Sequence, residues 1–480
     1  MSNEDLLYIN GVDAVTGDYL FPPISLAELA ARIKDTPVAP QEAQARAFAE
    51  QQTIACAKGL DDDVAPTDVK HAGWAVVFHK DEEPAVKKEV MRLYEHRRQQ
   101  LQNDACVKVL EYADEAECSQ WLEKYQVAAG NVYPWRVPYY LLLVGGPQRI
   151  PFDFCQMLSM EYATGLLHFA DAAAYARYVD SVIAYETGDA PPRQKAAVFF
   201  RTNRDPTTTL SAEHLVKPLA DGLPAAGDEP ARPAVAASKG FATHRLWDVD
   251  ATAAKLAEVF APPATTPPPA FLFSATHGVG FIQPTPGKQL ALQGALKCQD
   301  DTPFSAALLA NIEHVQVHGL IAFLFACYSA GTPQFDQYVT RTDRKPLQIA
   351  DQPFLAALPK ALLSHPQGGA LACIGHVERA WNYSFNTTKL GDQLIPYQNA
   401  VRRILGGLPV GYALTDMRQR YMSLAASVGR RLENSQLSNT PLEDQQLVTD
   451  WAARNDAGGY IVFGDPAVCL RLEGLVESDE

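Results

Sequence analysis

Short apolar runs alternate with segments of helical spacing along most of the 480-residue chain. The runs have strand length and are bounded by turn residues, which is typical of strands buried on both faces of a sheet. Strands that alternate with helices predict a parallel sheet covered by helices. This pattern predicts an α/β fold with a mostly parallel sheet flanked by helices.

The predicted elements fall into two series. The first series comprises strands at 73–79, 106–112 and 139–146 and helices at 85–101 and 114–125. The second follows a helix at 171–186 and comprises strands at 195–202, 243–249, 271–278, 319–327, 368–376 and 459–465 and a long helical region at about 393–430. Because a chain of this length exceeds one ordinary core, we expect more than one unit.

We predict a smaller N-terminal α/β subdomain over residues 1–190 and a second α/β domain over residues 191–480. Residues 1–70 are expected to be partly irregular, with helices at 25–34 and around 41–57.

Charge and cysteine usage exclude several classes of protein. The formal net charge of −15 argues against a partner that is a nucleic acid or an anionic membrane, since such surfaces need clustered Lys and Arg. No apolar run reaches the length of a membrane span, and the acidic start "MSNEDLLYIN" does not resemble an export signal. Eight cysteines occur without CxxC pairs. We therefore expect a cytoplasmic protein with free thiols.

Three predicted strands end in reactive side chains. "FLFSAT" is followed by His277, "GLIAFLFA" by Cys327, and "GGALACIG" by His376. In open α/β sheets the working residues lie just beyond the carboxyl ends of the strands. If these strands are parallel neighbours, the three side chains share one edge of the sheet.

A thiol and an imidazole at one edge suit nucleophilic catalysis. The imidazole lowers the pKa of the thiol and later protonates the leaving amine. Gly278 and Cys327 could supply backbone N–H groups for an oxyanion hole, worth roughly 3–4 kcal/mol per donor. His277 is the preferred base, and His376 remains the second candidate.

Other constellations fit less well. His318 begins the strand that Cys327 ends, so it lies about 30 Å away on the opposite edge, and His314 lies further back. The pair has i, i+4 spacing but no glutamate after the first histidine, so we predict no metal site. The sequence contains no P-loop, no GxGxxG and no GxSxG motif. The "FGDP" at 463–466 is predicted to be a turn that serves as scaffold, in which Asp465 satisfies local backbone groups.

Four segments resemble the caspase superfamily of cysteine peptidases, and its gingipain-like and bacterial CHAT-type branches more than animal caspases. They are "SATHG" (274–278), "FACYSAGTP" (325–333), "ACIGHVERAW" (372–381) and "VFGDPAVCLRL" (462–472). "YLLLVGGPQRIPF" (140–152) and "MEYATGLLHF" (160–169) also look like the first subdomain of gingipain-like proteins. The part of this resemblance that is specific to the superfamily is a His-Gly pair about 50 residues before an Ala-Cys pair.

The resemblance implies a caspase-like fold and a Cys/His dyad, with His277 as base and Cys327 as nucleophile. It implies an oxyanion hole from Gly278 and Cys327, no cofactor, a protein or peptide substrate and a regulatory protein partner. Bacterial relatives act in immune or cell-death systems, so that setting is expected too.

The resemblance also bears on the substrate. The thiol is flanked as Phe-Ala-Cys-Tyr-Ser-Ala-Gly, without the arginine of the animal caspase signature, so an aspartate preference is not expected. Many relatives cleave after Lys or Arg, which requires an acidic group in the first specificity pocket. Asp153, Asp336 and Glu378 are the candidates, and Trp381 is a candidate wall of that pocket.

The sequence therefore predicts a cysteine endopeptidase. The alternative is a catalytically silent scaffold that binds a partner through the same cleft.

Overall fold

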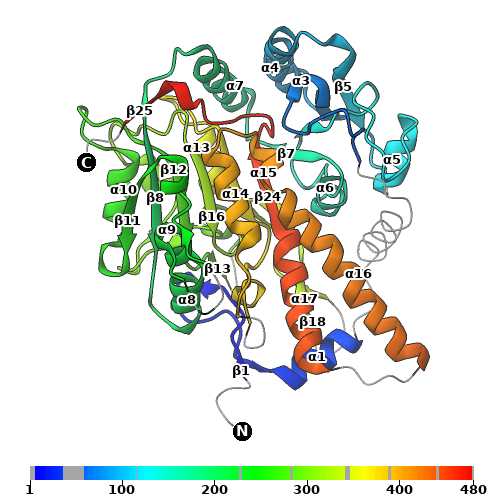
Figure 1. The fold of residues 1–480 in the computed structure, drawn as a ribbon, viewed down its shortest axis with the longest axis vertical. Helices are drawn as coiled ribbons and strands as arrows, with labels where there is room; N and C mark the ends of the chain where they lie inside the picture. Colours follow the sequence, from blue (N-terminus) through cyan, green and yellow to red (C-terminus); the bar gives the residue numbers. More distant parts are fainter. Residues whose placement is uncertain are drawn as a thin grey trace.

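A sheet of 11 strands forms the centre of the computed structural model, in the order β11-β8-β12-β16-β21-β24-β7-β6-β4-β5, with β25 beside β8 (Figure 1). The structure describes residues 6–35, 59–115, 117–225, 227, 230–281, 285–340, 346–387, 391–438 and 443–477. The strands are β4 (Trp74–His79), β5 (Val107–Tyr112), β6 (Tyr140–Val144), β7 (Ala163–Leu167), β8 (Arg193–Arg201), β11 (Ala242–Trp247), β12 (Pro269–Ala275), β16 (Ile321–Phe325), β21 (Ala372–His376), β24 (Tyr460–Gly464) and β25 (Leu475–Val476).

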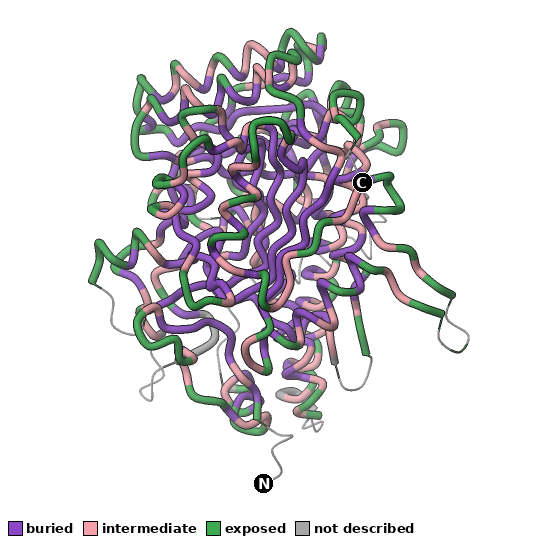
Figure 2. Tube along the Cα trace, turned by 90° about the vertical axis from the view of Figure 1, so that its left-hand side faces the viewer, coloured by how far each residue is buried: buried purple, intermediate pink, exposed green. Residues whose placement is uncertain are grey.

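The central strands are buried along their whole length, as their apolar sequences predict. Every residue of β6, β12 and β16 is buried, and Figure 2 shows these strands in the interior. Phe199, Phe273 and Phe323 stack across three neighbouring strands, with ring centroids 6.1 Å and 5.0 Å apart. The predicted α/β fold with a mostly parallel sheet flanked by helices is confirmed.

Helices flank the sheet (Figure 1). They are α4 (Pro84–Leu101), α5 (Cys118–Lys124), α6 (Phe152–Ser159), α7 (Ala172–Thr187), α8 (Pro206–Ser211), α9 (Lys217–Asp221), α10 (Ala253–Phe260), α11 (Pro286–Leu292), α12 (Ala306–Ala310), α13 (Ala357–Leu363), α14 (Ile395–Leu405), α15 (Val410–Ala413), α16 (Thr415–Ser438) and α17 (Asp444–Gly459). Local capping fixes several starts: the Asp171 carboxylate accepts from Ala174 N at 2.8 Å at the start of α7.

One strand from late in the chain joins the two series of elements. β24 pairs antiparallel with β21 and parallel with β7, while the other pairs in the sheet are parallel. The sheet is therefore continuous across residue 190. The division into units over 1–190 and 191–480 stays a prediction.

Residues 6–25 lie against the second series, although they begin the chain. β1 (Leu6–Leu7) pairs with β3 (Ile24–Ser25), and β2 (Val12–Asp13) pairs with β13 (Val279–Gly280). Helices α1 (Leu26–Asp35) and α3 (Val69–Ala72) follow, and α1 agrees with the helix predicted at 25–34. The helix predicted around 41–57 lies outside the described residues.

Several expected absences concern the described part of the chain. Among those residues, no helix has the length and apolarity to cross a membrane, and no cluster of three or more His, Cys, Asp or Glu side chains could hold a metal ion. The seven cysteines that the described ranges contain are unpaired.

Candidate active site

The register of β12 and β16 brings His277 and Cys327 to the same edge of the sheet. Ala275 lies opposite Phe325 in this parallel pair, and each candidate follows its strand end by two positions. Both side chains line one small cavity of ≈ 10 Å³. The other residues that line it are Asn10, Thr207, Thr208, Ser211, Thr276, Phe325, Ala380 and Asn382. Equal offsets from neighbouring strands thus place the imidazole and the thiol together.

The Cys327 side chain is enclosed. The residue is 2% exposed, and its thiol donates a weak hydrogen bond to the Ala380 carbonyl oxygen over 3.9 Å. A cavity of this size holds about one water molecule. Burial raises the pKa of the Cys327 thiol to about 12. In this conformation the sulfur is a protonated thiol at neutral pH, and the cavity is too small to admit a peptide.

This enclosure predicts an unusual pH profile for alkylation of Cys327 by iodoacetamide. Only the thiolate reacts, so the rate is expected to increase about tenfold per pH unit from pH 7 to pH 10 without a plateau, because this whole range lies below the raised pKa. Mass spectrometry of the peptide that contains Cys327 measures the rate. A plateau near pH 8 would contradict the enclosed thiol.

Asp205 holds the imidazole of His277. Its Oδ2 lies 2.8 Å from His277 Nε2, while its Oδ1 accepts from the backbone N–H groups of Thr207 and Thr208 at 2.9 and 3.0 Å. Burial alone would raise the pKa of the Asp205 carboxyl, but the hydrogen bond with His277 and the backbone donor Thr208 outweigh it and hold the pKa well below its usual range. A charged carboxylate therefore fixes the ring through Nε2. Nδ1 is the second nitrogen of this ring.

The sequence analysis missed Asp205. The residue caps the start of α8, in the loop that follows β8, and β8 is the neighbour of β12 on the side away from Cys327. The signal was present in "RTNRDPTTT" (201–209), where an Asp-Pro pair follows an apolar strand. Asp205 follows the carboxyl end of β8, so it belongs to the same edge of the sheet as His277 and Cys327.

The two expected oxyanion donors lie beside the thiol. A side-chain carbon on Gly278 would lie 1.7 Å from the Cys327 carbonyl oxygen, so only glycine permits this approach. The Gly278 backbone lies against the sulfur and contributes to lowering the pKa of the thiol, although burial dominates. Among the described residues, neither amide donates a hydrogen bond elsewhere in the backbone. Their role in an oxyanion hole stays a prediction.

His376, the second candidate for the base, lies in a different environment. It still belongs to β21, is fully buried, and packs edge-on against Tyr460 with ring centroids 4.9 Å apart. Its Nε2 lies 3.1 Å from the Asp456 carbonyl oxygen. His376 does not line the cavity that His277 and Cys327 share.

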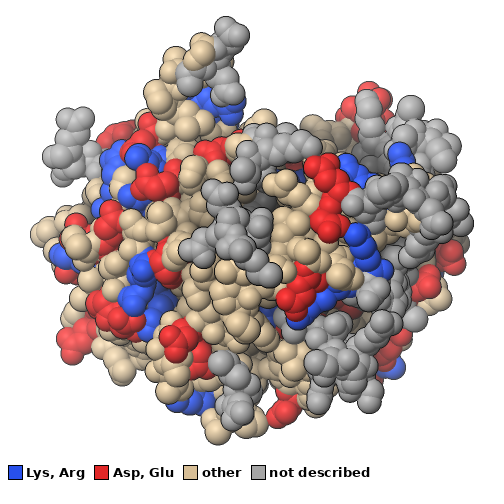
Figure 3. Space-filling view, turned by 90° about the horizontal axis from the view of Figure 1, so that it is seen from below, with Lys and Arg blue, Asp and Glu red and all other residues tan. Residues whose placement is uncertain are grey.

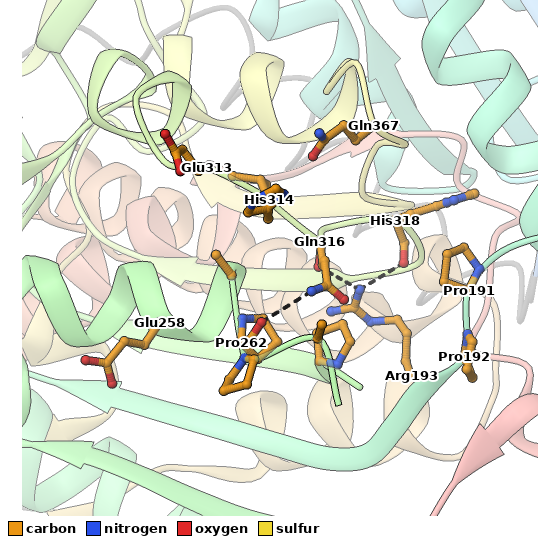
Figure 4. Close-up of a pocket in the computed structure, with 15 residues that line it drawn as sticks. Pro191, Pro192, Arg193, Glu258, Pro262, Glu313, His314, Gln316, His318 and Gln367 are labelled. Atoms are coloured by element: carbon orange, nitrogen blue, oxygen red, sulfur yellow. Dashed lines mark hydrogen bonds between the residues drawn. The ribbon is translucent and has the colours of Figure 1, made fainter. Parts of the chain in front are cut away.

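His318 and His314 lie at the opposite edge, as the strand length predicts. Both line a pocket of ≈ 740 Å³, shown in Figure 4. There the Arg193 guanidinium donates to the carbonyl oxygens of Gln316 and His318. It also donates to the carbonyl oxygen of Pro269. This arginine ties together the amino-terminal ends of neighbouring strands.

The structure does not bring the four candidate specificity residues into the shared cavity. Asp336 and Arg379 are both buried and form an ion pair, with Oδ1 and Nη1 3.1 Å apart. Glu378 Oε1 lies 3.7 Å from the same guanidinium. Asp153 is in the first turn of α6, and Trp381 packs on Trp451 with ring centroids 5.9 Å apart. Their part in substrate binding stays a prediction.

Comparison with known proteins identifies no family. No family model matches the chain, and no curated protein matches it. A solved structure described as "Structure of Protease" is similar over 83% of this chain and 78% of its own, with 11% sequence identity and a TM-score of 0.44. A similarity this remote carries no argument about activity. Any statement about activity therefore depends on the geometry of the site.

Proposed function

We propose that this protein is a cysteine endopeptidase in which Cys327 is the nucleophile and His277 the base. The observation that carries the proposal is the shared cavity at the strand ends, where the imidazole is fixed by Asp205 on the ring nitrogen away from the reaction. A nucleophile, a base and a group that orients the base are the parts that nucleophilic catalysis requires. The sequence resemblance to the caspase superfamily supports the same assignment.

The residues suggest a two-step reaction. Nδ1 of His277 accepts the thiol proton, and the sulfur attacks the peptide carbonyl carbon. The carbon–nitrogen bond breaks, His277 returns the proton to the leaving amine, and a thioester to Cys327 remains. Water, deprotonated by His277, then hydrolyses the thioester and releases the new carboxyl end. The amides of Gly278 and Cys327 would stabilise the oxyanion in both steps.

Peptide hydrolysis tests this proposal. The full chain and its Cys327→Ser variant are incubated with a proteome-derived peptide library, and new peptide termini are identified by mass spectrometry. We expect cleavage by the wild type with a consistent residue preference and none by the variant. Equal cleavage by the two proteins would reject the peptidase assignment. So would the absence of cleavage by a form of the protein whose Cys327 thiol is shown to be reactive.

The buried thiol is the one observation that favours the alternative, a silent scaffold that binds a partner. A thiol that is 2% exposed and protonated at neutral pH reacts slowly. A chloromethyl ketone separates the two functions, since only a thiolate activated by His277 reacts quickly with it. The proposed cleavage in a bacterial defence pathway and the regulatory partner rest on the resemblance alone.

Asp205→Asn is expected to lower kcat by about 10²-fold with little change in KM, because the ring of His277 loses its orientation. Asparagine keeps an oxygen for the helix cap, so the fold should persist.

Asp171→Asn is the matched control, because it makes the same change at the cap of α7. An unchanged kcat in Asp205→Asn would contradict a positioning role for this carboxylate.

A further inference from the structure

Residues 9–21, here termed the cover segment, fold back on themselves next to the candidate active site. The outgoing arm contains β2, which pairs in parallel with β13, so that Val12 lies opposite Val279 and Ala14 N donates to Gly280 O at 2.9 Å. The returning arm pairs with the first, with Leu20 N donating to Gly11 O at 3.1 Å. The segment thus lies along the residues that directly follow His277 and Gly278.

The returning arm places Tyr19 on the groups that orient the base. Its hydroxyl donates to Asp205 Oδ1 at 2.9 Å and lies 2.8 Å from Thr207 Oγ1. Its ring meets the His277 ring edge-on, with centroids 5.7 Å apart and planes at 90°. Tyr19 therefore covers one side of the imidazole.

Leu20 belongs to the apolar cluster that contains the thiol. It is 7% exposed and packs in one apolar cluster with Cys327 and Tyr328. Its methyl group fills the space that Gly280 leaves: a side-chain carbon on Gly280 would lie 2.6 Å from Leu20 Cδ1. Leu20 is thus part of the apolar surroundings of Cys327 and Tyr328.

Two further contacts bracket the site. Asn10 Nδ2 donates to the Ala380 carbonyl oxygen, which also accepts from the Cys327 thiol. Phe21 packs over the Arg379 guanidinium, 4.4 Å from the ring centroid. The cover segment therefore contacts three segments of the site, at 279–280, 327–328 and 379–380.

The cover segment has the properties of a ligand more than those of a structural element. It contributes no strand to the 11-stranded sheet, and its tip is exposed, with Val15 at 70%. Extended peptides bind by pairing with a free strand and placing alternate side chains in pockets. The segment makes both kinds of contact at a site proposed to cut peptides.

We infer that the groove under residues 9–21 is the peptide-binding groove of the enzyme, and that the cover segment is its resident occupant, which a substrate must displace. The inference rests on the proposed function. The substrate class is an extended peptide with a branched apolar side chain in the position of Leu20. On the face of the molecule seen from below, acidic and basic side chains are interspersed (Figure 3).

The test compares Leu20→Asp with Val15→Asp in the full chain. Both add one carboxylate to the same segment, but Leu20 is buried at the thiol and Val15 is exposed at the tip. Alkylation of Cys327 at pH 7.5 is measured by mass spectrometry. Losing the burial of Leu20 should accelerate it by about tenfold to hundredfold, while Val15→Asp should match the wild type. Cys373, buried in β21, reports unfolding in the same sample.

A synthetic peptide with the sequence of residues 9–21 supplies the second arm. Added to Leu20→Asp, it should slow Cys327 alkylation again by about tenfold. The same peptide with aspartate in place of leucine should not. If Cys373 reacts faster in Leu20→Asp, the milder Leu20→Ala is judged by the same two measurements.

Equal rates of Cys327 alkylation in the wild type and both Leu20 variants would overturn the inference that a peptide-binding groove lies under residues 9–21. This holds even if the wild type cleaves peptides. Fast alkylation in Leu20→Asp without any peptide cleavage would support the groove and reject the peptidase. The two failures are therefore distinguishable.

Discussion

Replacing Cys327 with alanine is expected to lower kcat/KM for peptide hydrolysis by at least about 10⁴-fold, because no other group can form the thioester. His277→Ala should cause a loss of similar size, since the thiol then lacks its base. The double variant should be little worse than either single one, as residues that act as a unit are not additive. Initial rates on a fluorogenic peptide measure all three.

The matched control is Cys298→Ala, which removes another fully buried thiol that lies outside the shared cavity. It should retain the wild-type rate. Near-normal turnover by Cys327→Ala would end the assignment of this thiol as nucleophile, whatever the fate of the alternative function.

Asp465→Ala is expected to reduce the free energy of unfolding by about 3–5 kcal/mol, because it leaves a buried guanidinium without one of its partners. Asp465 is fully buried, and its Oδ2 accepts from Arg97 Nε and Nη2 at 2.9 and 2.7 Å. Its Oδ1 accepts from Trp74 Nε1 at 2.9 Å. The carboxylate therefore ties the end of β24 to β4 and α4, across 391 and 368 positions of sequence.

The comparison is Asp444→Ala, which breaks an exposed ion pair with Lys34 (2.6 Å) and should cost about 0–1 kcal/mol. Urea-unfolding midpoints of the full chain, followed by tryptophan fluorescence, give both values. Equal midpoints for the two variants would show that the Asp465 network does not stabilise the fold.

The sheet could be predicted because its strands are buried on both faces. The runs predicted at 271–278, 319–327 and 368–376 contain β12, β16 and β21 almost entirely. Two-sided burial needs an unbroken apolar sequence, and local sequence records it directly. The shared edge of His277 and Cys327 followed from the same fact and from the parallel direction of the strands.

What could not be predicted depends on pairings between distant segments. No local pattern shows that β24 is antiparallel to β21, or that β2 pairs with β13, since each pairing depends on a partner far away in sequence. Asp465 was predicted to satisfy local backbone groups, and it does accept from Ala467 N at 2.9 Å. Its bonds to Arg97 and Trp74 come from the other end of the chain.

The position of β24 also has a consequence for biosynthesis. Until residues 460–464 have left the ribosome, β21 and β7 each present one open edge, and an open edge invites pairing with other chains. The two halves of the sheet can therefore be joined only after β24, which is made late in translation, becomes available. A nascent chain stalled before residue 460 should be prone to aggregation and dependent on chaperones.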